Sequence, residues 1–340
     1  MKRFLLTLAL AAPGVAMVAA QQPAAPAAAA PATLAQRIAH TDPTKFRASP
    51  RVHDGAGQLD YMALFNSPSF DTNQWFLHRG VIEPKSGIGV HFHNQCEEMF
   101  VIFDGEAQFT IDGRTATVKG PAGVPTRMGH SHAIYNATDK PVQWMNINIT
   151  QLKGVYDAFN LGDTREGAPL DPIANFMVMK LDRGMLGQMN ASALTKGTGQ
   201  FRRALGPSVF LTTWSYMDHI LLAPGAAMKN ATPGIGETFY AMAGKGTVTV
   251  GNETQPFAAG DAVPIRIGEE KAFENTGTEP LELMVIGVAK DMATKDALTM
   301  AGGARGALAA AGGGRGGGRG AGAPGAGRGG AGAPGAGRGN

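Results

Sequence analysis

The 340-residue sequence contains a single cysteine, Cys96, so it cannot form an intramolecular disulfide. Beyond residue 20 it has no apolar run long enough to cross a bilayer, and no membrane span is expected. Without disulfides, stability must come from a buried apolar core. The chain is long enough to build two domains with such cores.

Both ends of the chain lack the composition of a folded domain. Lys2 and Arg3 precede a mostly apolar stretch that ends in Val18-Ala19-Ala20, a pattern that predicts a cleaved signal peptide over residues 1–20. The protein is therefore expected to be exported, either to the periplasm or out of the cell. Residues 21–33 form an Ala/Pro-rich linker, and residues 301–340 form a Gly/Ala/Arg-rich tail that is predicted to be disordered.

The net charge of +3 does not describe the part of the chain that should fold. Without Lys2, Arg3 and the five arginines of residues 301–340, which contain no acidic residue, the charge is −4. A mildly acidic folded part gives no reason to expect nucleic-acid binding. The predicted partner is a small-molecule substrate.

Short apolar runs separated by Gly, Pro, Asn and Asp fill two regions, residues 61–150 and 202–289. Many short strands with glycine-rich turns are typical of an all-β barrel or sandwich. Asp112-Gly113 predicts a hairpin turn, because both residues tolerate the left-handed backbone that such turns need. The strands predicted in the first region are residues 75–82, 100–111 with a break at Asp104-Gly105, 133–135 and 142–149.

The rest of the folded part has weaker patterns. Residues 34–60 indicate no firm element, residues 181–194 are a candidate short helix, and residues 291–300 are predicted to be helical. The expected organisation is an N-terminal domain (34–150), a connection (151–200) and a C-terminal domain (201–290).

The segment from His91 to Gly105 carries the clearest chemical signal. His91 and His93 are two residues apart, so in a strand both imidazoles point to the same face. Glu98 follows after a short turn, at the start of an alternating apolar run. Two imidazoles facing a carboxylate across a hairpin are the beginning of a divalent metal site, and His132 is the candidate third imidazole.

The two β regions repeat one unit. A shift of 139 residues aligns them without a gap over roughly 50 positions. The matching residues include turn glycines, a proline and a carboxylate: Glu98 and Glu237, Phe100 and Phe239, Gly105 and Gly244, Pro125 and Pro264, Gly129 and Gly268, Asn136 and Asn275.

The second copy lacks all three histidines. Asn230, Thr232 and Lys271 stand where His91, His93 and His132 stand in the first copy. Joint loss indicates that the three imidazoles act together, so we expect one metal centre per chain, in the N-terminal unit. In the second unit we expect Lys271 and Glu237 to form a buried ion pair at the vacated position.

These residues resemble the two motifs of the cupin superfamily. The first motif, His-x-His, three or four residues, Glu, six residues, Gly, is matched by His91, His93, Glu98 and Gly105. The second ends Gly-x-x-His-x-x-x-Asn and is matched by Gly129, His132 and Asn136. The chain departs from the family pattern in two places. Lys85 replaces the glycine six positions before the first His, where Gly87 or Gly89 could serve. Pro125 lies two residues away from its usual distance to Gly129.

The resemblance covers about residues 60–150 and, without the ligands, 205–290. It implies a bicupin, with two tandem double-stranded β-helix (jelly-roll) barrels of six to eight strands, and pairing of barrels into a homo-oligomer. It also implies one divalent transition metal, Mn, Fe, Co, Ni, Cu or Zn, held by the four candidate ligands. Three imidazoles and a carboxylate leave one or two coordination positions open, as in a catalytic site.

The function expected from this resemblance is a metal-dependent enzyme acting on a small oxygen-rich molecule. Bicupins with one active barrel include ring-cleaving dioxygenases, which favours an oxidoreductase. Three alternatives remain: a lyase, isomerase or decarboxylase acting on sugar acids or carboxylates, a non-catalytic periplasmic sugar- or metal-binding protein, and a storage-like or surface structural protein, which would not explain the metal ligands. The four retained ligands favour catalysis over binding.

Other polar residues near the motifs have two interpretations each. His130 is a weak candidate for a catalytic base or else a surface residue, and Cys96 is either a sulfur near the metal or a small buried side chain. His78 either lines the pocket or is a hydrogen-bonded histidine in the core or at the surface. Glu97 should face away from Glu98 and be solvated. Two further side chains, Asn146 and Asn148, share a face and either line the mouth of the barrel or form a buried polar pair. Four side chains are predicted to point into the barrel: Phe100, Ile102, Phe109 and Ile111.

Overall fold

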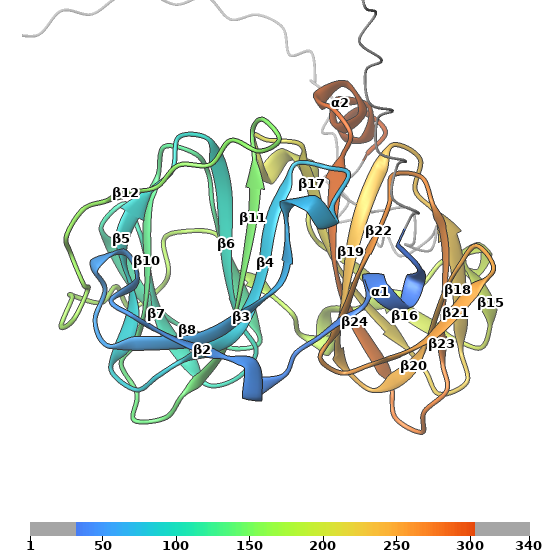
Figure 1. The fold of residues 1–340 in the computed structure, drawn as a ribbon, viewed down its shortest axis with the longest axis horizontal. Helices are drawn as coiled ribbons and strands as arrows, with labels where there is room; N and C mark the ends of the chain where they lie inside the picture. Colours follow the sequence, from blue (N-terminus) through green and yellow to red (C-terminus); the bar gives the residue numbers. More distant parts are fainter. Residues whose placement is uncertain (1–31, 303–340) are drawn as a thin grey trace, which may run out of the picture.

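The computed structural model of the protein describes residues 32–302 and contains two β-barrels that lie side by side (Figure 1). The predicted signal peptide, nearly all of the Ala/Pro-rich linker and the tail from residue 303 lie outside the described residues. Within the described part, neither helix has the length and apolar character needed to span a bilayer.

The first barrel is built from twelve antiparallel strands in two sheets. The strands are β2 (Arg47–Pro50), β3 (Gln58–Asn66), β4 (Gln74–Ile82), β5 (Ser86–Phe92), β6 (Cys96–Ile102), β7 (Glu106–Ile111), β8 (Arg114–Lys119), β9 (Ala122–Thr126), β10 (Ser131–Asn136), β11 (Val142–Thr150), β12 (Phe159–Asn160) and β13 (Met179–Lys180). The seven-stranded sheet has the order β13-β9-β6-β11-β4-β3-β2, and the five-stranded sheet has the order β12-β5-β10-β7-β8.

The second barrel repeats this plan. Its strands are β1 (Ala39–His40), β14 (Gly187–Gln188), β15 (Leu194–Lys196), β16 (Gly199–Leu205), β17 (Trp214–Leu222), β18 (Ala227–Ala231), β19 (Ile235–Ala243), β20 (Lys245–Val250), β21 (Glu253–Ala258), β22 (Asp261–Ile265), β23 (Glu270–Asn275) and β24 (Leu281–Ala289). The seven-stranded order is β1-β22-β19-β24-β17-β16-β14, and the five-stranded order is β15-β18-β23-β20-β21. The expected all-β fold of two tandem jelly-roll barrels is confirmed.

Short helical segments connect the strands. The α-helices are α1 (Leu34–Arg37) and α2 (Met292–Met300), and the 3-10 turns are η1 (Pro43–Lys45), η2 (Val52–Asp54), η3 (Ser67–Ser69), η4 (Arg183–Met185), η5 (Ala191–Ala193) and η6 (Pro207–Val209). The predicted C-terminal helix is confirmed by α2. The candidate helix at residues 181–194 is wrong, because two single 3-10 turns flank the short strand β14 there. Asp182 and Asn190 each accept a hydrogen bond from the backbone two residues later, which favours isolated turns.

Three apolar clusters stabilise the molecule. One fills each barrel, and the third joins the outer faces of the two seven-stranded sheets, where Leu77, Met99 and Ile147 meet Met217 and Ile286. The two barrels therefore share a continuous apolar interface. The side chains predicted to point into the first barrel do so: Phe100, Ile102 and Phe109 are buried and Ile111 is half-buried against them.

The sequence repeat corresponds to a repeat of strand register. Phe100 pairs with Val124, and the residues 139 positions later, Phe239 and Val263, pair in the same way. The predicted Asp112-Gly113 hairpin is confirmed, since both residues have positive φ angles (48° and 77°) between β7 and β8. Each barrel has twelve strands rather than the expected six to eight, and three of the twelve are short edge strands from residues 39–50 and 159–196.

The segment before the first barrel packs on the second barrel. Ala39 in β1 pairs with Ala262 in β22, and the side chain of Arg37 forms an ion pair with Glu269 at 2.6 Å. Leu34 is buried in the apolar cluster of the second barrel. In Figure 1 this blue segment lies against the orange strands of the other barrel. Residues 34–40, expected within the N-terminal domain, therefore belong to the second barrel by contact.

Glu97 corrects a prediction from strand parity. It does face away from Glu98, but it is fully buried (0% exposed) rather than solvated. Its carboxylate accepts hydrogen bonds from the backbone N–H groups of Leu211 and Thr212 at 2.8 Å each and from the Thr212 hydroxyl at 2.7 Å. The side chain points into the interface between the barrels, which single-barrel reasoning could not foresee.

Candidate metal centre

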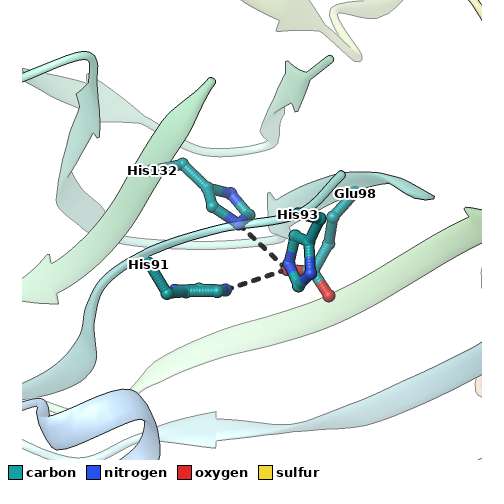
Figure 2. A group of neighbouring side chains, drawn as sticks. All are labelled: His91, His93, Glu98 and His132. Atoms are coloured by element: carbon teal, nitrogen blue, oxygen red, sulfur yellow. Dashed lines mark hydrogen bonds and ion pairs between the residues drawn. The ribbon is translucent and has the colours of Figure 1, made fainter. Parts of the chain in front are cut away.

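The four side chains of the predicted metal site meet inside the first barrel (Figure 2). His91 lies on β5 directly opposite His132 on β10, and His93 follows the end of β5. Glu98 comes from β6 in the other sheet and reaches across the barrel. One donor atom from each of the four side chains lies within 4.8 Å of the others, and all four side chains are buried.

Backbone carbonyls fix two of the imidazoles. Nδ1 of His91 lies 2.8 Å from the carbonyl oxygen of Gly89, and Nδ1 of His93 lies 2.5 Å from that of Asp157. A carbonyl can only accept, so each Nδ1 carries a proton, and in the neutral ring Nε2 carries a lone pair. Both Nε2 atoms are therefore presented as ligands, which is the usual way that a protein orients a metal-binding histidine.

The lone pairs converge on one oxygen of Glu98. Nε2 of His91, His93 and His132 lies 3.4, 3.2 and 3.2 Å from Oε2 of Glu98. Although it is buried, Nε2 of His132 makes no hydrogen bond in the described part of the chain. Four electron-pair donors around one point repel one another unless a cation lies between them. Two ligands at about 2.1 Å from one metal lie at most about 4.2 Å apart, so these distances fit a shared ion.

The second oxygen of Glu98 is held by amides. Nδ2 of Asn146 donates to Oε1 at 2.9 Å, and Nδ2 of Asn148 lies 3.4 Å from the same oxygen. The two asparagines come from β11, which pairs with β6. They therefore orient the carboxylate so that its other oxygen faces the imidazoles. Both asparagines are buried, as expected for a polar pair, and Asn146 also lines the cavity beside the centre.

The protonation of these side chains follows from charge and burial. Burial and the neighbouring His91 lower the pKa of His132 to about 3. Burial also opposes a charge on His93, but Glu98 and Cys96 outweigh it and raise its pKa to about 11. Burial raises the pKa of Glu98, yet the charge on His93 and the close approach of the three imidazoles bring it well below its usual range. A metal ion would replace the proton that His93 otherwise keeps.

The centre opens into a cavity of about 110 Å³ inside the same barrel. Its walls are mostly aromatic and aliphatic, and Glu98 is the single carboxylate among the described residues that line it. No lysine or arginine from the described part of the chain lines it. The lining residues are Val52, His53, Leu59, Tyr61, Phe76, His78, Ile88, Glu98, Phe100, Trp144, Asn146 and Tyr156.

Two of the lining residues that were not singled out in the sequence lie close to the ligand histidines. His53 lies in the η2 turn, and its ring stacks on that of His91 with centroids 3.8 Å apart. Tyr156 lies in the loop after β11, 5.5 Å from the His93 ring. The signal for His53 was a glycine pattern: a Cβ on Gly55 or Gly89 would lie 2.2 Å from a backbone oxygen, so only glycine lets the η2 turn lie against β5.

The remaining candidates occupy different places. His130 is exposed and forms an ion pair with Asp112 at 2.6 Å, outside the cavity. Cys96 is buried and accepts a hydrogen bond from Nδ2 of Asn148 at 3.2 Å. Lys85, which replaces the family glycine, keeps the left-handed backbone that a glycine would adopt (φ 53°). The turn before β5 is thus preserved despite the substitution.

The second barrel fills the corresponding position with its own side chains. Nζ of Lys271 forms a close ion pair with Oε2 of Glu237, and both residues are buried. The hydroxyl of Tyr216 donates to Oε1 of Glu237 at 2.8 Å, and the Thr232 hydroxyl donates to Oε2 at 3.0 Å. The expected buried ion pair is confirmed.

Comparison with known proteins agrees with this architecture. The family model of the cupin domain matches residues 78–148 and 219–287, one stretch in each barrel. The chain therefore contains two cupin domains and is a bicupin. No curated protein sequence matches it significantly.

Solved structures share the fold at low sequence identity. The coconut allergen cocosin has a TM-score of 0.55 and is 14% identical, with 74% of this chain and 85% of that chain covered. A deletion mutant of oxalate decarboxylase from Bacillus subtilis has a TM-score of 0.53 and 15% identity, covering 74% and 77%. A mutant salicylate 1,2-dioxygenase from Pseudoaminobacter salicylatoxidans, in complex with gentisate, has a TM-score of 0.51 and 14% identity, covering 70% and 76%.

Proposed function

We propose that this protein is an exported, metal-dependent bicupin oxidoreductase of the dioxygenase type, acting on a small oxygen-rich molecule. The observation that carries the proposal is the convergence of three imidazole nitrogens on one buried carboxylate oxygen beside an aromatic cavity. Export rests on the sequence of residues 1–20, and assembly into a homo-oligomer through edge strands is part of the same proposal.

His91, His93, Glu98 and His132 would hold one divalent transition metal. When bound, the metal supplies a Lewis acid or an oxygen-binding centre. The carbonyls of Gly89 and Asp157 keep the imidazoles in the right tautomer, and the asparagines on β11 orient the carboxylate. The apolar walls keep water away from the bound substrate.

The aromatic walls of the cavity support an aromatic substrate of the kind a dioxygenase takes. Among the described residues none of the lining side chains is a lysine or arginine, so the metal would be the cationic partner of any buried carboxylate. The salicylate dioxygenase and the oxalate decarboxylase share the fold, and the latter has Mn(II) centres. Manganese is therefore one metal to examine, together with Fe, Co, Ni, Cu and Zn.

A lyase or isomerase acting on sugar acids is the second enzymatic candidate, and a non-catalytic binding protein is the third. The contrast between the barrels supports catalysis. The second barrel closes its site with Lys271 and Glu237, whereas the first keeps four ligands beside a cavity. A protein that only stores or binds a sugar needs no such centre.

The metal content of protein purified without added metal tests the centre. We expect one metal per chain in the wild type and in Glu237→Ala, and none in His93→Ala. Glu237 is the matched control because it occupies the equivalent position in the second barrel. Oxygen uptake is then measured against phenols, oxalate and uronates. Two metals per chain would contradict the single centre, and zinc or nickel without oxygen uptake would favour the lyase or isomerase.

A further inference from the structure

His78 has an unusual position for a half-buried histidine. Its ring lies on β4 in the wall of the cavity, stacked on Phe76 with centroids 4.1 Å apart and near Tyr61 at 5.3 Å. Within residues 32–302, neither ring nitrogen has a hydrogen-bond partner. Neither nitrogen is a fully buried atom, so the imidazole is open to whatever occupies the cavity.

The second barrel shows which residue takes this position in a barrel without the metal-binding histidines. His78 pairs across the sheet with Asn146, and Asp218 pairs with Val285, which lies 139 residues after Asn146. Asp218 is therefore the structural counterpart of His78. Its carboxylate is buried and satisfied by Arg203 at 2.8 and 3.0 Å. The barrel without metal ligands closes this position internally, and the barrel with them leaves it open.

We propose that His78 accepts the proton of a substrate hydroxyl, and that the substrate is a small, flat, uncharged molecule carrying hydroxyl groups. This inference rests on the proposed function, because it places the substrate in the cavity beside Glu98. His78 would be a catalytic residue in the strict sense, since it touches the substrate.

The substrate class follows from the cavity. Five aromatic side chains besides the histidines line it, and such walls favour a planar molecule. They are Tyr61, Phe76, Phe100, Trp144 and, in the loop after β11, Tyr156. A dry apolar cavity of about 150 Å³ holds one benzene ring, so 110 Å³ with an opening to solvent suits a single ring with its substituents at the mouth. No lysine or arginine among the described residues lines the cavity, so apart from the metal no cation would balance a charged substituent, which favours an uncharged molecule.

The proton transfer is balanced between the substrate hydroxyl and His78. The substrate O–H bond breaks, its electron pair stays on the oxygen, and the proton forms an N–H bond with the lone-pair nitrogen of His78. Burial lowers the pKa of His78 to about 4, so the ring is neutral and carries a free lone pair at neutral pH. The charge of the ionised substrate oxygen beside it then stabilises the imidazolium that forms. The titratable groups that face the same cavity are Glu98 from β6, Tyr61 from β3, His53 from η2 and Tyr156 from the loop after β11.

The test uses protein loaded with zinc, which has no redox chemistry, and 4-nitrocatechol, whose visible absorption changes when a hydroxyl ionises. The spectrum of the bound probe is followed from pH 5 to pH 8. We expect the wild type to ionise the bound probe at a pH where the free probe is neutral. In His78→Gln and His78→Phe the midpoint should rise by about one pH unit or more, which is a tenfold change in the ionisation equilibrium.

His130→Gln is the matched control, because it makes the same substitution at an exposed histidine outside the cavity. It should ionise the probe as the wild type does. An unchanged midpoint in both His78 variants would overturn the assignment, and so would failure of the wild type to bind the probe. For any phenol that supports oxygen uptake, His78→Gln should lower kcat/KM about 10²- to 10⁴-fold. If no phenol supports oxygen uptake but the spectrum of the bound probe still depends on His78, the proposed oxidoreductase function is wrong and the proton-accepting role of His78 stands.

Discussion

Replacement of Glu97 by alanine should loosen the two barrels from each other. The carboxylate is fully buried and accepts hydrogen bonds from the N–H groups of Leu211 and Thr212 and from the Thr212 hydroxyl. The hydroxyl can turn to another acceptor, but the two N–H groups cannot. The buried N–H of Thr212 left without a partner costs about 2 kcal/mol, and the N–H of Leu211, which is only partly buried, costs less. Glu97→Ala should therefore lower the free energy of unfolding by about 2–3 kcal/mol.

Glu97→Gln separates the hydrogen bonds from the shape of the side chain. The amide keeps one acceptor oxygen and turns a donor toward the other N–H, so about half of the loss is expected. Urea unfolding, followed by tryptophan fluorescence, measures both variants, with Glu279→Ala as the control because Glu279 is exposed. The control should change the free energy by no more than about 0.5 kcal/mol.

The result that would refute this reasoning is a loss below about 1 kcal/mol in Glu97→Ala, since water would then have replaced the carboxylate at no large cost. A total stability of about 5–15 kcal/mol makes the predicted loss easy to measure. Because Glu97 precedes Glu98 in β6, the same variant should also weaken metal binding, and equal metal content would separate the two roles.

Three further changes have definite expected results. Folding lowers the pKa of His78 from 6.5 to about 4, so its unfolded form binds the extra proton and stability is lost as the pH falls from about 6.5 to about 4. His78→Phe should remove this loss, of the order of 3 kcal/mol, in urea unfolding series at several pH values. Lys271→Met should destabilise the second barrel by about 3–5 kcal/mol, because Glu237 then keeps a buried charge without its cationic partner. Adding Glu237→Leu should recover part of the lost stability. Equal stability of the single and double variants in thermal unfolding would contradict this. Asn146→Leu should lower metal affinity about 10- to 100-fold in competition with a chelator, without changing the circular dichroism of the fold.

The ligand set was predictable because local rules determine it. Alternation along a strand places His91 and His93 together, the repeat shows which histidines vary jointly, and the turn residues give the hairpins. The same comparison between copies predicted the Lys271–Glu237 pair. Each of these inferences needs only residues close in sequence or related by the repeat.

The features that were missed depend on contacts between distant parts of the chain. The burial of Glu97 comes from the other barrel, and the role of Gly55 comes from the close approach of the η2 turn to β5. His53 reaches His91 only through that approach. The helix expected at residues 181–194 does not form, because the side chains of Asp182 and Asn190 cap isolated 3-10 turns instead. No periodicity within a single segment carries this information.

The short strand β1 also sets an order of events during synthesis. It leaves the ribosome well before its partner, because Ala39 pairs with Ala262, more than 200 residues later in the chain. At roughly 5–20 residues per second, that interval is about 10–45 s. Throughout it, the apolar Leu34 has no cluster to enter, and the first barrel can close while its leading segment is still unattached. Once β22 has been made, β1 pairs with it and attaches the beginning of the folded chain to the second barrel. The second barrel is therefore complete only after both β1 and β22 have been synthesised.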